Sequence, residues 1–175
     1  MILQRVAALP RLPSLRHPVG MERQPTVIKA TDFIGICEEM AMKSVPGHLR
    51  PTGRKVMWTI LQLHYGDPAC HFELQPQPSR NNIELGLHFE GEASLNEARA
   101  LLIARECPAI LASLGPQWEL EEWTGSWRRL HRTFRAPTLT QAIAAEVATA
   151  LTSLVTSTGS LVQEMSIARA VSSGG

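Results

Sequence analysis

The chain has 175 residues, 44% of them hydrophobic and 19% charged, and a formal net charge of +1. This length suits a single domain with its own core, and this composition excludes an intrinsically disordered chain. Three of the 17 basic residues and none of the 16 acidic residues lie in the first 20 positions. The remainder is therefore slightly acidic, which excludes a broadly basic surface for non-specific binding of nucleic acid.

The sequence predicts an extension over residues 1–20, one domain over residues 21–170 and a short tail over residues 171–175. Three prolines in the first 20 residues argue against a helical targeting segment there, and Met21 offers a second candidate start. The three cysteines have no paired spacing, which indicates a reducing, cytoplasmic location. No run of 18 apolar residues occurs, so no membrane span is expected.

The first predicted elements are a helix and a strand. Thr31 is expected to cap the helix, which should end near Ser44. A loop rich in proline, glycine and basic residues follows. Residues 56–65 are rich in β-branched and aromatic side chains, and their nearly continuous apolar character predicts one central strand covered on both faces.

A hairpin is predicted from two segments in which apolar and polar residues alternate. These segments are residues 70–75 and 83–90, joined by a loop rich in proline and asparagine. Because alternate side chains of a strand point to opposite faces, the apolar set should face the core and the polar set should share the other face.

A second helix should begin at a capping box formed by Ser94 and Glu97. Pro108 would either split this helix or kink it. Gly115 is expected to end it. A second hairpin is then predicted, with its turn at residues 124–126, glutamates before the turn and arginines after it.

The last predicted element is a helix opened by a capping box of Thr138 and Gln141, which Gly159 would either end or weaken. The expected order is α-β-β-β-α-β-β-α. Strands joined in short hairpins favour an α+β fold, with an antiparallel sheet of about five strands and helices mainly on one face. The uncovered face is where a functional site is expected.

A metal site is the first candidate on that face. His71, Glu73, Glu84, His88 and Glu90 all fall on the polar side of the first hairpin. Imidazole and carboxylate ligands suit Zn²⁺, Mn²⁺ or Fe²⁺ with an open position for water, and the predicted ligands are His71, Glu73, Glu84 and His88. The alternative is that these residues are simply the solvated outer side of a half-exposed hairpin.

An anion or ligand site is the second candidate. Arginine pairs well with phosphate and carboxylate groups, and tryptophan can stack on bases. The alternative is that the arginines pair with glutamates across the second hairpin. The residues concerned are Arg128, Arg129, Arg132, Arg135 and Trp127.

Three functions therefore remain open. The first is a binding or assembly module, acting through a protein partner or self-association, because no recognised catalytic motif is present. The second is a metal-assisted hydrolase that uses the His/Glu face. The third is a binder of phosphate or nucleic acid that uses the arginine hairpin. The sequence predicts no cofactor other than a divalent metal, since it contains neither a GxGxxG nor a Walker A motif.

Overall fold

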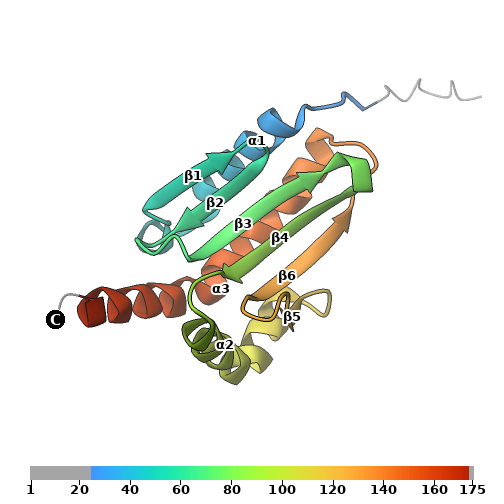
Figure 1. Ribbon diagram of the computed structural model, residues 1–175. Helices are drawn as coiled ribbons and strands as arrows, with labels where there is room; N and C mark the ends of the chain where they lie inside the picture. The colour runs from blue at the N-terminus through green and yellow to red at the C-terminus, as the bar shows by residue number, and fades with distance from the viewer. Residues whose placement is uncertain (1–24, 174–175) are drawn as a thin grey trace, which may run out of the picture.

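The computed structural model describes residues 25–173, so the predicted extension and the end of the predicted tail lie outside the described residues. It shows a six-stranded antiparallel sheet with the strand order β1-β2-β3-β4-β6-β5 and helices on one face (Figure 1). The α+β class and the antiparallel sheet are thus confirmed. The elements are α1 (Ala30–Ser44), β1 (Gly53–Met57), β2 (Ile60–His64), β3 (Cys70–Gln77), β4 (Asn82–Phe89), α2 (Ala93–Leu114), β5 (Glu119–Glu122), β6 (Arg128–Arg135) and α3 (Gln141–Ser173), with short 3-10 turns at Gly47–Leu49 and Pro78–Arg80.

The core lies between the sheet and the helices. The predicted hairpin is β3 and β4, and its register places Phe72 opposite Leu87 and Leu74 opposite Leu85, with all four side chains buried. Leu130 of β6 lies beside Leu87 on the same face. The apolar half of the period-two pattern therefore builds the core, and the polar half is left on the opposite face.

The prediction of one strand over residues 56–65 is wrong. This segment belongs to a tight hairpin, in which β1 and β2 pair from Gly53 opposite His64 to Met57 opposite Ile60. The turn lies at Trp58, whose φ is +53° and whose side chain is 91% exposed. The sequence does not predict this turn, because a bulky residue seldom adopts positive φ and no glycine, asparagine or proline marks the position.

The predicted N-terminal caps are also wrong, each by two residues. The residue that precedes α1 is Lys29 rather than Thr31, and it makes no capping bond with its side chain. At α2 the Glu92 carboxylate accepts hydrogen bonds from the backbone N–H groups of Ser94 and Leu95. At α3 the Thr140 hydroxyl accepts a bond from the Ile143 N–H. The unpaired backbone N–H groups at a helix N-terminus bond to whichever nearby side-chain oxygen reaches them. The capping-box motif alone therefore does not fix which residue is the cap.

Neither internal helix breaker ends its helix. Helix α2 continues past Pro108 and ends at Leu114, before Gly115, as predicted; Gly115 has a φ of +91°. The assigned α3 runs through Gly159. A Cβ at position 159 would lie 2.9 Å from the Tyr65 hydroxyl, so the glycine allows α3 to approach the turn after β2 closely.

A buried ion pair fastens α2 to the loop between β2 and β3. Arg99 of α2 is 1% exposed, and its guanidinium pairs with the carboxylate of Asp67, which is 6% exposed. The other Asp67 oxygen accepts a hydrogen bond from the Ala69 N–H at 3.0 Å. The loop that leads into β3 is therefore held from the helical layer.

We expect replacement of Asp67 by Asn, or of Arg99 by Gln, to lower the free energy of unfolding by about 3–5 kcal/mol, because each change leaves a buried charge without its partner. Urea denaturation would measure this loss. Lys43→Gln, which breaks an exposed pair with Glu39 on α1, should leave the unfolding midpoint unchanged. Similar midpoints for all three variants would contradict the role of the buried pair.

Candidate metal centre

The polar face of the two central strands, β3 and β4, brings two histidines together near one end of their ladder. His71 lies opposite His88 in the strand register, and their ring centroids are 5.6 Å apart. Both side chains leave the sheet on the same face, as the alternation predicts. His71 is 1% exposed and His88 is completely buried. The interpretation of this face as a solvated outer surface is therefore wrong for the histidines.

Tryptophans of the β5–β6 hairpin cover one side of this centre. The ring of Trp123 meets His88 edge-on at 5.6 Å between centroids, and Trp127 lies 5.5 Å from Trp123. The guanidinium of Arg129 stacks over Trp123 at 4.8 Å. This cover depends on how two hairpins far apart in the sequence meet, which strand periodicity alone does not reveal.

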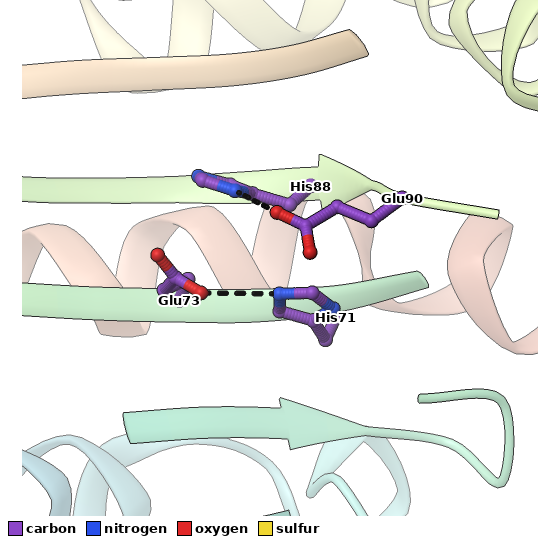
Figure 2. A group of neighbouring side chains, drawn as sticks. All are labelled: His71, Glu73, His88 and Glu90. Carbon is purple, nitrogen blue, oxygen red and sulfur yellow. Dashed lines mark hydrogen bonds and ion pairs between the residues drawn. The ribbon is translucent and has the colours of Figure 1, made fainter. Parts of the chain in front are cut away.

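The orientation of His71 is fixed by its backbone neighbour. Its Nδ1 lies 2.8 Å from the carbonyl oxygen of Pro68, which can only accept, so Nδ1 carries a proton and donates it. Its Nε2 lies 3.3 Å from Oε2 of Glu73 (Figure 2). That same oxygen accepts a hydrogen bond from Gln62 at 2.9 Å. A metal-binding histidine commonly donates its other ring N–H to a carbonyl group in this way.

His88 lies among carboxylates. Its Nδ1 is 3.3 Å from Glu90, which follows β4 and turns back over the strand (Figure 2). Its Nε2 is 3.5 Å from Glu84 and has no hydrogen-bond partner within residues 25–173. Burial alone lowers the pKa of the ring, but the carboxylates outweigh burial and raise the pKa of His88 to about 9.

Four side chains form a group suited to a metal ion. Each of His71, Glu73, His88 and Glu90 offers one ligand atom, and these atoms lie within 4.8 Å of one another. Metal–ligand bonds of about 2.1 Å bring ligand atoms on opposite sides of an ion to roughly 4.2 Å. Small rotations of the side chains would therefore close the group around an ion.

Glu84, a predicted ligand, lies outside this group and has another partner. It pairs with Arg129 of β6, which also bonds Glu121 of β5. Burial raises the pKa of Glu84, but His88 and Arg129 outweigh it, and the net shift is downward. Glu84 is therefore held as a carboxylate beside the histidines, and Glu90, on the same face, is the fourth member of the group.

Gly86 makes room for the rings on this face. A Cβ at this position would lie 3.0 Å from Nε2 of His88 and 2.9 Å from the Cβ of His131. His131 itself is 3.1 Å from Glu121 and, with Glu119, forms a second group of ligand-type atoms. Arg129 already pairs with Glu121, which makes this second group a poorer site for a cation.

The predicted arginine cluster is divided between the two faces of β6. Arg128 and Arg132 point to the helical side, where they pair with Glu97 of α2 and Glu146 of α3. Arg129 lies on the polar face with its glutamates, together with Trp127. Arg135, also on the polar face, lies at the far end of the strand and is exposed. The predicted pairing across the second hairpin is confirmed, with Glu121 opposite Arg129 and Glu122 opposite Arg128.

A pocket of about 690 Å³ opens over the candidate centre. The carboxylates of Glu73, Glu84 and Glu90 contribute to its lining, and the two hairpin tryptophans form part of its wall. Gln62, Gln75 and Arg80 lie along the same pocket. A molecule in this pocket would therefore lie against Glu73 and Glu90 of the ligand group and would be bounded by aromatic and amide side chains.

No known family model matches the chain, and no curated protein matches its sequence significantly. Among the described residues, no helix has the length and apolar character needed to cross a lipid bilayer.

We expect the folded, metal-free protein to show His88 titrating near pH 9. Because this pKa is above the ordinary value of 6.5, the protonated ring stabilises the fold fully below about pH 6.5, and this contribution is lost as the pH rises through 9. The stability difference between the wild type and His88→Gln should thus shrink over this range in chemical denaturation with a chelator present. A stability difference that stays constant or grows over this pH range would contradict the raised pKa of His88.

Proposed function

We propose that the protein binds a divalent transition metal ion through His71, Glu73, His88 and Glu90, and uses it to hydrolyse a bond of a substrate held in the adjacent pocket. The observation that carries this proposal is the convergence of two imidazoles and two carboxylates from paired strands within 4.8 Å. Zn²⁺, Mn²⁺ and Fe²⁺ accept this set of ligands.

The contact between His71 and Glu73 supports a cation at this point. Since Nδ1 of His71 donates to Pro68, a neutral His71 ring turns the lone pair of Nε2 toward a carboxylate oxygen 3.3 Å away. Two acceptors facing each other in a buried site repel unless a proton or a metal cation lies between them. A metal ion would be shared by both groups at once.

The charge balance of the buried face supports the same conclusion. Glu84 and Glu121 pair with the guanidinium of Arg129, while Glu73 and Glu90 lie beside His71 and His88, so carboxylates are in excess on this face. Without a metal, a proton on His88 offsets part of this excess, as its raised pKa shows. A divalent ion would replace that proton and bring more positive charge, because imidazole binds metal in its neutral form.

The chemistry proposed for the centre is activation of water. A bound divalent ion lowers the pKa of a coordinated water molecule toward neutrality and polarises a carbonyl or phosphoryl group. Glu84 is a carboxylate outside the ligand group that also lines the pocket, so it is placed to accept the proton of the attacking water and return it to the leaving group.

We expect purified protein to bind one equivalent of Zn²⁺ or Mn²⁺, measured by isothermal titration calorimetry after chelator treatment. Glu73→Gln and Glu90→Gln each remove one charged ligand while keeping its shape, and should weaken binding by about 10- to 100-fold. Glu122→Gln, on the helical side of β5, is the matched control and should bind like the wild type. Loss of affinity in all three variants, or no saturable binding by the wild type, would exclude the site.

Turnover separates an enzyme from a metal-dependent binding module. We expect the metal-loaded protein to hydrolyse p-nitrophenyl acetate or p-nitrophenyl phosphate, and Glu84→Gln to lower kcat by about 100-fold or more while metal is still bound. Hydrolysis can be followed by the absorbance of nitrophenolate. Equal rates for the wild type and Glu84→Gln would remove Glu84 from the mechanism, and the absence of turnover with metal bound would favour the binding module.

One observation favours a binding or assembly module as the second candidate. β1 is one of the two edge strands of the sheet, and the turn that follows it exposes 91% of Trp58. Val56 of β1 is also exposed. An edge strand with exposed apolar side chains is a surface to which another protein chain can add.

A further inference from the structure

A smaller pocket lies at the opposite end of β4 from the tryptophans. Its volume is about 360 Å³, and its lining consists of Arg80, Asn81, Asn82, Thr133 and Arg135. We propose that this pocket binds a tetrahedral oxyanion, of the kind presented by inorganic phosphate or by the phosphate group of a small molecule. This site goes beyond the proposed metal chemistry and does not depend on it.

The backbone around this pocket is held in place. Asn82 pairs with Arg135 across β4 and β6, and the ladder continues through a bond from the Ala136 N–H to the Asn81 carbonyl at 2.8 Å. Asn81 adopts a left-handed conformation with a φ of +54°, which ends the short turn that carries Arg80. The two arginines are therefore presented from a paired strand and from the tight turn beside it.

The charges of this pocket are what identify its ligand. Three of the four arginines of β6 pair with glutamates. Within residues 25–173, neither Arg135 nor Arg80 has a carboxylate within ion-pair distance, and the side-chain bond of Arg80 goes to Gln77. Two guanidiniums that share a pocket of this size repel each other, and an anion bound between them turns that repulsion into attraction.

Hydrogen-bond donors complete the site. Arginine offers paired N–H groups that match the oxygens of phosphate, and the Thr133 hydroxyl adds a further donor. Oδ1 of Asn82 is buried and has no hydrogen-bond partner among the described residues. Exchanging the oxygen and nitrogen of this amide would place an NH₂ group at that buried position.

The surroundings favour a small ligand over a nucleic acid. The other arginines of β6 are neutralised, so no continuous basic track leads away from the pocket along this strand. Arg80 also lines the larger pocket above the candidate metal centre. A phosphate-bearing molecule anchored here could therefore extend toward that centre.

Calorimetry with inorganic phosphate tests the proposal, using metal-free protein in chelator and low salt so that phosphate cannot bind through a metal ion. We expect saturable binding that weakens by roughly tenfold or more in Arg80→Gln and in Arg135→Gln, because each loses charge-assisted hydrogen bonds. Arg105→Gln changes the same charge at an exposed position of α2 and is the control. Thermal unfolding should show that all three variants are folded.

Two further ligands identify the source of the anion. Glycerol phosphate should compete with inorganic phosphate if the natural ligand is a phosphomonoester, and should fail to compete if the pocket admits only the free ion. Tight binding of a single-stranded oligonucleotide that survives both substitutions would overturn the proposal. Absence of saturable phosphate binding, or equal weakening in Arg105→Gln, would overturn it as well.

Discussion

The pairing of β3 with β4 determines the chemistry of the uncovered face. This register places His71 beside His88 and at the same time sends Phe72, Leu74, Leu85 and Leu87 into the core. A shift of one residue would reverse both sets, so the core that stabilises the fold also holds the imidazoles together. The histidines are buried next to carboxylates. Their environment differs from an ordinary solvated sheet surface because each polar group has to be compensated by a neighbour.

Period-two alternation made the β3–β4 hairpin predictable, and the opposite charges of β5 and β6 made the second hairpin predictable. β1 and β2 have no comparable signal. Their apolar residues follow one another closely, and the turn at Trp58 uses a residue type that local preferences assign to a strand. The strand propensities of these residues therefore predict an extended segment, but they do not indicate that the chain reverses direction within it. The six strands observed, in place of about five, follow from this one hidden turn.

The sequence predicts where the candidate metal centre lies, but it does not predict which residues form the group. Alternation placed His71, Glu73, Glu84 and His88 on one face, and the structure brings three of them together with Glu90. Glu84 differs from Glu90 because it forms an ion pair with Arg129 of β6. Contacts between residues 45 positions apart depend on strand order, which residue spacing does not encode. The same is true of Arg80 and Arg135, which line one pocket because β6 lies beside β4.

The loop between β2 and β3 joins two parts of the molecule that the sheet otherwise separates. On the helical side, Arg99 of α2 forms an ion pair with Asp67. On the polar side, the carbonyl of the next residue, Pro68, receives the N–H of His71. A shift of α2 along its axis would consequently be transmitted through two adjacent residues to the orientation of an imidazole ring. Mutations in the middle of this helix could thus change the chemistry of a pocket that they never touch.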